Sequence, residues 1–387
     1  MADTSTPAAP AAPVRSRGLA GVIALDTAIC FIDGEAGELL YRGYEIDDLA
    51  RNASFEEVAY LLWHGDLPTQ TELDALHTQL RSERALRPQI IDHLRHHTPT
   101  DANPMAALRT AVSMMAAYDP DAEDMSPEAN LRKAIRLTAK MPTLLAAFDR
   151  IRKGQEPVAP KGEGSTAYEF LYMLNNEAPG PSAERIFDAA LVLQAEHDLN
   201  ASTFAARVIG STLADMYSAI TGALGALKGP LHGGANIEVM RMLLEIDASG
   251  EDTSAYVARK FAAKEKLMGL GHRVYKTLDP RAAILRDMLE GLSREKGEMK
   301  WYDMSVAIMD AAKGQKNLNP NVDFFSASVF HLLGIETDLY TPIFAVSRIT
   351  GWTAHLLEQY GDNALIRPSS EYVGERGRTV RPIAERG

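Results

Sequence analysis

Residues 228–236 read Lys-Gly-Pro-Leu-His-Gly-Gly-Ala-Asn, which places a histidine between the end of one helix and the start of the next. Gly229 and Pro230 stop the apolar run before them, because glycine tolerates positive φ and proline cannot continue a helix. A new periodic run starts at Ala235, so His232 is expected near the N-terminus of a second helix. A helix dipole disfavours imidazolium there, which predicts a neutral ring able to donate a hydrogen bond to a developing oxyanion. The alternative is a loop histidine in a glycine turn.

Helical periodicity dominates on both sides of this stretch and predicts a mainly α fold, since no alternation of strands and helices occurs. The exception is a short β-hairpin over residues 27–41, where Asp33-Gly34 is a turn signal between two apolar runs. A helix that begins after Ser126 is expected to kink or break at Pro142. Residues 208–227 are long enough to span a bilayer, but they carry hydroxyl side chains and lack basic flanking loops. We therefore expect one fully buried helix there and no membrane segment.

Composition excludes several functional classes. The chain has 387 residues, of which 46% are hydrophobic and 24% charged, so it can form a large core or two domains. Its formal charge of −12 disfavours a nucleic-acid surface. The single cysteine, Cys30, allows no intramolecular disulfide and fits a reducing compartment, so we expect a cytoplasmic protein. The first 18 residues are rich in alanine and broken by prolines, which predicts a solvated tail and not a signal peptide.

Two further segments carry candidate binding residues. A helix starting near Ser182 has an apolar face that ends at His197, which is either a core residue or the wall of a cavity. Residues 254–268 form an expected basic amphipathic helix. The loop that follows it, 268–276, contains Gly-Leu-Gly but lacks the third glycine and the preceding strand of a dinucleotide fingerprint. It is an accessible loop beside lysines, suited to a ligand that carries phosphate.

Charged residues near expected helix ends complete the set. Asp279 is a predicted N-cap followed by a proline and Arg281, so this end of a helix could seat a carboxylate, although a nearby acid could also pair with the arginine. Asp323 is most simply another N-cap, and such a carboxylate is ionised and oriented, as a base for a carbon acid must be. Arg348 and Arg367 stand in apolar surroundings, and each should have an anionic partner, either a protein acid or a dicarboxylate ligand.

Taken in order, these segments resemble the citrate synthase family, in its shorter, dimeric, bacterial and archaeal type. The resemblance covers roughly residues 19–387, and no single motif carries it alone. The matching residues are 40–44 (Leu-Tyr-Arg-Gly-Tyr), 196–202 (Glu-His-Asp-Leu-Asn-Ala-Ser), 227–235 (Leu-Lys-Gly-Pro-Leu-His-Gly-Gly-Ala), 267–276 (Leu-Met-Gly-Leu-Gly-His-Arg-Val-Tyr-Lys), 279–281 (Asp-Pro-Arg), 320–324 (Pro-Asn-Val-Asp-Phe), Ser347, Arg348, Gly351, Trp352, His355 and 366–368 (Ile-Arg-Pro).

The resemblance implies a helical homodimer that binds neither nucleic acid nor membrane. Each subunit would have a tail (1–18), a large dimer-forming domain (19–232 with 329–387) and a small domain (233–328) that closes over the substrates. The short N-terminus lacks the extra segment of larger hexameric relatives that NADH inhibits, so neither a hexamer nor NADH control is expected.

The resemblance also implies the chemistry. Acetyl-CoA would be a co-substrate, and no cofactor or metal would be permanently bound. Asp323 would take a proton from its methyl group, His232 would stabilise the resulting enolate, and His272 would polarise the ketone of oxaloacetate. The implied oxaloacetate residues are His197, His272, Arg281, Arg348 and Arg367, the last from the other subunit. The implied CoA residues are Lys264, Lys266, Leu267, Met268, Gly269, Leu270, Lys316 and Asn321.

Three alternatives remain open. A 2-methylcitrate synthase would perform the same chemistry on propionyl-CoA, and the motifs do not discriminate between them, because one methylene shifts selectivity by only about 1–3 kcal/mol. A helical interaction protein with incidental histidines would show no oxaloacetate-dependent release of CoA. A metal site could lie at Asp92, His93, His96 and His97, although exposed histidine clusters are mostly solvated.

Overall fold

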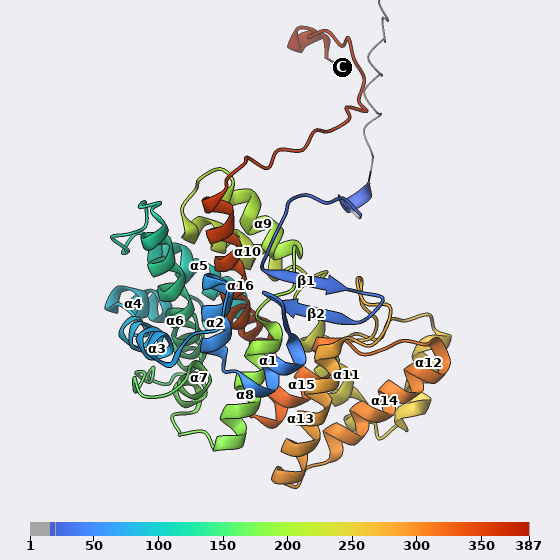
Figure 1. Ribbon diagram of the computed structural model, residues 1–387. Helices are drawn as coiled ribbons and strands as arrows, with labels where there is room; N and C mark the ends of the chain where they lie inside the picture. Colours follow the sequence, from blue (N-terminus) through green and yellow to red (C-terminus); the bar gives the residue numbers. More distant parts are fainter. Residues whose placement is uncertain (1–15, 20, 387) are drawn as a thin grey trace, which may run out of the picture.

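The computed structural model describes residues 16–19 and 21–386, and within them helices dominate, as predicted (Figure 1). The α-helices are α1 (Ile46–Asn52), α2 (Phe55–His64), α3 (Gln70–Glu83), α4 (Pro88–His96), α5 (Pro104–Ala116), α6 (Pro127–Arg152), α7 (Thr166–Asn175), α8 (Pro181–Gln194), α9 (Ala201–Gly210), α10 (Met216–Leu227), α11 (Ala235–Ser249), α12 (Thr253–Ala262), α13 (Pro280–Lys296), α14 (Lys300–Lys316), α15 (Val322–Leu332) and α16 (Tyr340–Gly361). Short 3₁₀ turns lie at Arg17–Leu19, Thr337–Leu339 and Ile383–Glu385.

The predicted hairpin is confirmed. Strands β1 (Cys30–Asp33) and β2 (Glu38–Tyr41) pair antiparallel, with Cys30 opposite Tyr41 and Asp33 opposite Glu38, and β3 (Tyr44–Glu45) adds a short third strand. Asp33 shapes the turn, because its Oδ1 accepts the N–H groups of Glu35 and Ala36 at 2.9 Å each. The hairpin reaches across the front of the molecule toward the loops before α13 (Figure 1).

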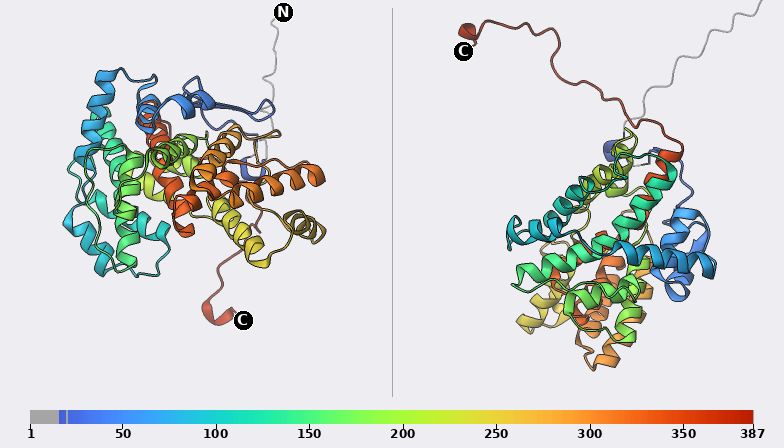
Figure 2. Two further views of the ribbon diagram at one scale, coloured as in Figure 1. Left: turned by 90° about the horizontal axis from the view of Figure 1, so that it is seen from below. Right: turned by 90° about the vertical axis from the view of Figure 1, so that its left-hand side faces the viewer.

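The helices form two groups that match the expected lobes in outline. α11 to α15 pack on one another at one end of the molecule, while α16 lies among α2, α6, α8 and α9 in the other group (Figures 1 and 2). The predicted boundary after residue 328 falls inside α15, whose later residue Phe330 packs against Phe187 of α8 with ring centroids 6.0 Å apart. The division into domains at 233–328 therefore stays a prediction, and α15 continues from one group into the other.

Residues 208–227 are two helices and not one, so that prediction was wrong. α9 ends at Gly210 and α10 begins at Met216, because Asp215 caps α10 by accepting the N–H of Ser218 at 3.0 Å. Close helix contact is present: the Cα of Gly222 faces Ile209 so closely that a Cβ there would overlap its side chain. Within the described residues, no helix is both long and apolar enough to cross a membrane.

Three other boundaries differ from prediction. α6 runs continuously through Pro142 instead of breaking there. The basic helix ends at Ala262, and Lys264 adopts a left-handed φ of 59° in the loop that follows. α8 ends at Gln194, so His197 lies beyond its last turn. Of the predicted N-terminal tail, residues 1–15 lie outside the described part. At the other end of the chain, residues 369–386 extend away from the body and are exposed (Figure 1).

Candidate active site

His232 lies in the turn between α10 and α11 and is held by the first turn of α9. Its Nε2 accepts the backbone N–H of Ser202 at 3.3 Å and lies 2.8 Å from Ser202 Oγ. A backbone N–H can only donate, so the proton of a neutral ring is on Nδ1. Ser202 Oγ accepts the indole N–H of Trp352 at 3.0 Å and donates its own hydrogen to Asn200 Oδ1 at 2.8 Å, which holds Ser202 in place beside His232.

The predicted neutrality of His232 agrees with its environment. Burial, and then the charge of Arg348, lower the pKa of His232 to about 4. The helix end that contacts the ring belongs to α9, whose second residue is Ser202, and not to α11. The lowered pKa of His232 thus agrees with the predicted neutral ring, but its causes are burial and Arg348 and not the dipole of α11.

His272 has the opposite tautomer. Its Nδ1 accepts the N–H groups of Val274 at 3.0 Å and Tyr275 at 3.2 Å, so its proton is on Nε2. Burial, and then Arg281, lower the pKa of His272 to about 4. Its ring lies 5.2 Å from that of His197, centroid to centroid, edge to face.

His197 is a buried, neutral ring with an unused donor or acceptor. Burial, followed by the charges of Arg281, His272 and Arg348, holds the pKa of His197 well below its ordinary value. Its Nε2 has no hydrogen-bond partner in the described part of the chain. Buried polar atoms are rarely left unpaired, so His197 fits the wall of a ligand cavity better than a satisfied core residue.

Asp279 connects two of the predicted site residues. Its carboxylate caps α13 and binds Arg281 through two side-chain hydrogen bonds, at 3.0 and 2.8 Å, and both residues are buried. The same carboxylate accepts the N–H of Val322 at 3.1 Å, at the start of α15. The predicted N-cap is thus confirmed, and Arg281 pairs with that buried cap and not with a surface acid.

Asp323 is not an N-cap, contrary to prediction. Asn321 caps α15, accepting the N–H of Asp323 at 3.0 Å, and Asp323 is the second residue of the helix. Burial raises the pKa of Asp323 to about 6, while the positive charges of Arg281 and Arg348 oppose that rise. The carboxyl is therefore mostly ionised at pH 7 yet far more basic than an exposed aspartate.

Arg348 is a buried cation without an ion-pair partner among the described residues. Its Nε donates to the carbonyl of Gln194 at 2.8 Å, and its guanidinium lies 4.7 Å from the ring centroid of Phe344. The nearest acid in electrostatic effect, Glu196, is hydrogen-bonded to His355 at 3.2 Å instead. The positive charge of Arg348 acts on His197, His232 and Asp323 alike, so these three side chains lie around one buried guanidinium.

Within one chain, Arg367 lies apart from the other predicted site residues. It is exposed, and it lines a groove of about 770 Å³ beside Arg207 and Leu365, so its predicted apolar surroundings are only partial. Thirteen helical residues separate Arg348 from the end of α16 at Gly361, about 20 Å of helix axis. The N–H of Ile366 donates to Ser211 Oγ at 3.0 Å, at the end of α9, and the chain beyond residue 368 leads away from the body (Figure 1).

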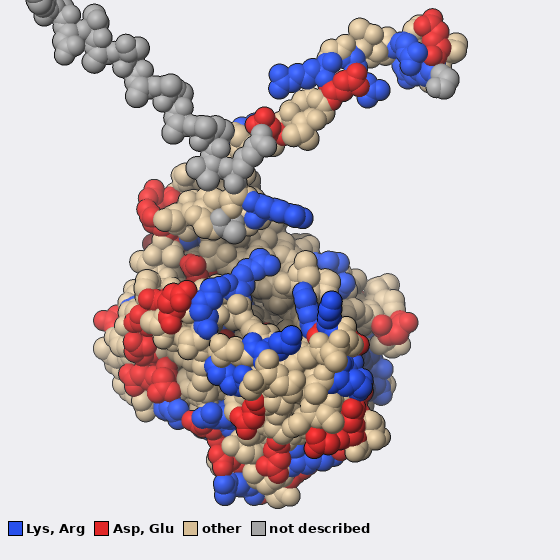
Figure 3. Space-filling view, turned by 90° about the vertical axis from the view of Figure 1, so that its right-hand side faces the viewer, with Lys and Arg blue, Asp and Glu red and all other residues tan. Residues whose placement is uncertain are grey.

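The eight residues predicted for CoA all line one pocket of about 530 Å³, together with Phe261 of α12. Three of them are lysines (Lys264, Lys266 and Lys316), which suit an anionic ligand, and lysine and arginine side chains gather around a hollow on this end of the molecule (Figure 3). Gly269, with φ of 76°, has no room for a Cβ, which would lie 2.5 Å from Val239 Cγ2.

The pocket loop is tied to the start of α15. Asn321 donates its N–H to the carbonyl of Gly269 and its side-chain amide to the carbonyl of Gly271, both at 2.9 Å. The N–H of Gly271 donates to the carbonyl of Asn319 at 2.7 Å. Because these bonds join the segments that precede His272 and Asp323, the two side chains are positioned relative to each other by backbone.

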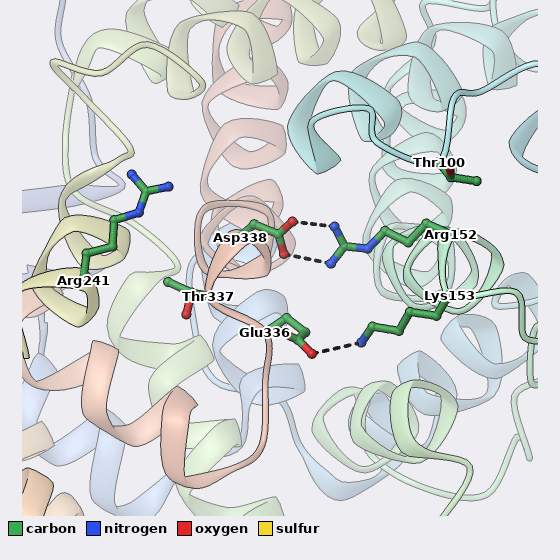
Figure 4. Close-up of a pocket in the computed structure, with 7 residues that line it drawn as sticks. All are labelled: Thr100, Arg152, Lys153, Arg241, Glu336, Thr337 and Asp338. Atoms are coloured by element: carbon green, nitrogen blue, oxygen red, sulfur yellow. Dashed lines mark hydrogen bonds and ion pairs between the residues drawn. The ribbon is translucent and has the colours of Figure 1, made fainter. Parts of the chain in front are cut away.

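A further hollow contains paired charges. An open pocket of about 550 Å³ at the end of α6 contains the ion pairs Arg152–Asp338 and Lys153–Glu336 (Figure 4). Among the described residues, no group of three or more His, Cys, Asp or Glu side chains is arranged to hold a metal ion, so nothing supports the alternative site at residues 92–97.

Sequence reasoning missed Ser202 as the partner of His232, Trp352 as the partner of Ser202, and Asp279 as the link between Arg281 and α15. Ser202 and Trp352 stood in the matching motifs, yet no local pattern pairs residues 150 positions apart. The sequence did predict Asp279 as an N-cap, but capping explains only its bond to the backbone N–H of Arg281 and not its bonds to the Arg281 side chain or to Val322.

Comparison with known proteins agrees with this geometry. The family model described as citrate synthase, C-terminal domain, matches residues 18–369. Citrate synthase 2 of Bacillus subtilis is 54% identical over 371 residues, which are 96% of this chain and 99% of that protein. The 2-methylcitrate synthase 2 of Corynebacterium glutamicum is 44% identical over 375 residues, 96% of this chain and 97% of that one.

The similar solved structures are also citrate synthases. Citrate synthase of Pyrobaculum aerophilum superposes with a TM-score of 0.89 at 39% identity, covering 95% of each chain. A ternary complex of the Thermoplasma acidophilum citrate synthase with carboxymethyl coenzyme A and oxaloacetate superposes with a TM-score of 0.88 at 36% identity, covering 95% of this chain and 98% of that one. The chain therefore belongs to the citrate synthase family of acyl-transferring enzymes.

Proposed function

We propose that this enzyme condenses acetyl-CoA with oxaloacetate and hydrolyses the resulting citryl-CoA to citrate and CoA. The observation that carries the proposal is that one buried cation, Arg348, acts on both a basic, partly buried carboxylate at Asp323 and a neutral His232 whose Nε2 is already an acceptor, which leaves Nδ1–H as its donor. The thioester methyl is a very weak acid, so deprotonation requires a base and an oxyanion donor in the same step.

In the proposed first step, one residue acts as the base and another as the oxyanion donor. Asp323 removes a proton from the methyl group of acetyl-CoA, and a pKa of about 6 makes it a stronger base than a solvated aspartate while it stays ionised at pH 7. His232 donates Nδ1–H to the thioester oxygen as the enolate forms. A preorganised donor of this kind contributes roughly 3–4 kcal/mol.

The second step forms the carbon–carbon bond. His272 donates Nε2–H to the ketone oxygen of oxaloacetate, which increases the electrophilicity of the carbonyl carbon that the enolate attacks. His197 and the buried guanidiniums of Arg281 and Arg348 bind the carboxylates, because a substrate anion supplies the partner that Arg348 lacks. Water then cleaves the thioester of citryl-CoA and releases CoA.

Assembly and closure belong to the proposal as well. The family resemblance of the sequence suggests a homodimer, and the exposed position of Arg367 is compatible with its entering the active site of the partner subunit. The lysine-lined pocket would hold CoA, and closure of the small lobe would exclude water from the intermediate.

Preference for acetyl-CoA over propionyl-CoA is the finer part of the proposal, and a 2-methylcitrate synthase remains the second candidate because a named relative at 44% identity has that activity. The test is the initial rate of CoA thiol release with each thioester and oxaloacetate. A higher kcat/KM with acetyl-CoA supports the proposal, whereas a clear preference for propionyl-CoA reverses it.

A further inference from the structure

The tip of the β1–β2 hairpin, residues 33–37, contacts the loop that carries His272 backbone to backbone. The N–H of Lys276 donates to the carbonyl of Gly34 at 2.8 Å. A Cβ on Gly34 would overlap the carbonyl oxygen of Val274 and lie 2.9 Å from its carbonyl carbon. A Cβ on Gly37 would lie 2.7 Å from Thr277 Cγ2. The two backbones approach as closely as glycine permits.

The tip is a rigid support. Asp33 Oδ1 accepts two backbone N–H groups of the turn, and its carbonyl accepts the N–H of Gly37 at 2.9 Å. The base of the hairpin is fixed by the buried Tyr41, whose hydroxyl donates to the carbonyl of Glu196 at 2.8 Å. The hairpin therefore connects the segment before His197 to the loop of His272.

One peptide unit transmits the contact to the imidazole. The carbonyl of Val274, against which Gly34 packs, and the N–H of Tyr275, which donates to His272 Nδ1 at 3.2 Å, belong to the same planar group. Tilting that plane to make room at Gly34 moves the N–H away from His272. The N–H of Val274, at 3.0 Å, lies one peptide earlier and shares the displacement.

We propose that Gly34 is a positioning residue: the hairpin tip orients the Val274–Tyr275 peptide, which fixes His272 as an Nε2–H donor aimed at the substrate ketone. The inference rests on the proposed function only for its kinetic consequence. The predicted orientation and tautomer of His272 are properties of the unliganded chain.

The kinetic test compares Gly34→Ala with Gly43→Ala in the full-length enzyme. Gly34 has no left-handed φ, so alanine there introduces the Val274 overlap without backbone strain. Gly43, between β2 and β3, has φ of 90° and no atom within 4 Å of the position a Cβ would take, so alanine there strains the hairpin without touching the loop. Gly34→Ala should lower kcat/KM for oxaloacetate roughly tenfold to a hundredfold, whereas Gly43→Ala should lower the melting temperature and leave kcat/KM unchanged.

A spectroscopic readout does not depend on turnover. In protein labelled with ¹⁵N-histidine, with the His272 signals assigned by His272→Asn, we expect Nε2–H in the wild type and in Gly43→Ala. In Gly34→Ala we expect a mixed tautomer. Asp33→Ala, which loosens the turn without adding atoms, should shift the signals in the same direction and covers the case in which Gly34→Ala fails to fold.

The experiments distinguish failure of this inference from failure of the proposed function. An unchanged His272 tautomer in both Gly34→Ala and Asp33→Ala overturns the inference, as does an equal loss of kcat/KM in Gly43→Ala. A wild-type enzyme that releases no CoA thiol with oxaloacetate refutes the proposed function instead, and the ¹⁵N spectra then still decide on the hairpin tip.

Discussion

Replacing the proposed base by its amide, Asp323→Asn, should abolish turnover and stabilise the fold at neutral pH. Burial raises the pKa of Asp323 from 3.8 to about 6, so ionising this carboxyl costs the folded chain about 3 kcal/mol at pH 7 relative to the unfolded chain. The dipole of α15 stabilises the ionised carboxylate by roughly 0.3–1 kcal/mol, because Asp323 is in the first turn of that helix. Asparagine removes both effects, so the free energy of unfolding should rise by about 2 kcal/mol.

The direction of the pKa shift of Asp323 determines the pH range over which stability changes. The folded-state pKa of Asp323 lies above the unfolded value, so the folded state binds more protons between about pH 4 and pH 6 and loses stability as pH rises through that window. The gain from Asp323→Asn should therefore be full at pH 7, fall to about half a kcal/mol at pH 4 and vanish below about pH 3, where the carboxyl is protonated in both the folded and the unfolded state.

Urea unfolding of both proteins at pH 7 and pH 4 measures this difference. Asp303→Asn is the matched control, because Asp303 is an exposed acid in the first turn of α14. This control should lower the free energy of unfolding by no more than a few tenths of a kcal/mol. Calorimetry should show that Asp323→Asn still binds oxaloacetate. A variant less stable than the wild type at pH 7, or one that no longer binds oxaloacetate, would refute the reasoning and assign Asp323 a structural role.

Three further predictions follow from single contacts. Ser202→Ala should lower kcat roughly fivefold to tenfold and lower the free energy of unfolding by about 1–3 kcal/mol, because it removes the Oγ contact of His232 Nε2, leaving only the backbone N–H, and leaves the indole N–H of Trp352 buried without an acceptor; wild-type kinetics would contradict it. Arg367→Ala should raise KM for oxaloacetate roughly tenfold to a hundredfold with little change in melting temperature, and a large drop in melting temperature would indicate packing instead. The rate profile in kcat/KM for acetyl-CoA should fall tenfold per pH unit below about pH 6, where Asp323 takes up its proton, and a flat profile down to pH 5 would exclude it as the base.

The sequence was sufficient wherever one local rule acted alone. The hairpin around Asp33-Gly34, the cap at Ser126 and the cap at Asp279 follow from side chains that bond their own backbone within a few residues. The predicted CoA residues surround one pocket largely because six of the eight fall within 264–270.

Local rules failed where two of them competed. Asn321 and Asp323 are both good caps, and only the tertiary bonds of Asn321 to the 269–271 loop decide that the helix starts at Val322. The long apolar run over 208–227 hid the stop before Asp215, since hydrophobic periodicity continues on both sides of it.

Long-range contacts could not be predicted from sequence at all. Ser202 meets His232 across 30 positions and Trp352 across 150, and these bonds depend on how α9 and α16 pack. The tautomers of His232 and His272, and hence the direction in which each donates, are consequences of such contacts and become visible only with coordinates.

Exchange of the methyl protons of acetyl-CoA for deuterium tests most directly whether Asp323 and His232 act on one carbon acid. The measurement uses NMR in heavy water with malate in the second substrate site, because malate has no ketone and the enolate can only take its proton back. We predict exchange in the wild type and its loss in both Asp323→Asn and His232→Ala. Exchange that persists at the wild-type rate in either variant would contradict the account.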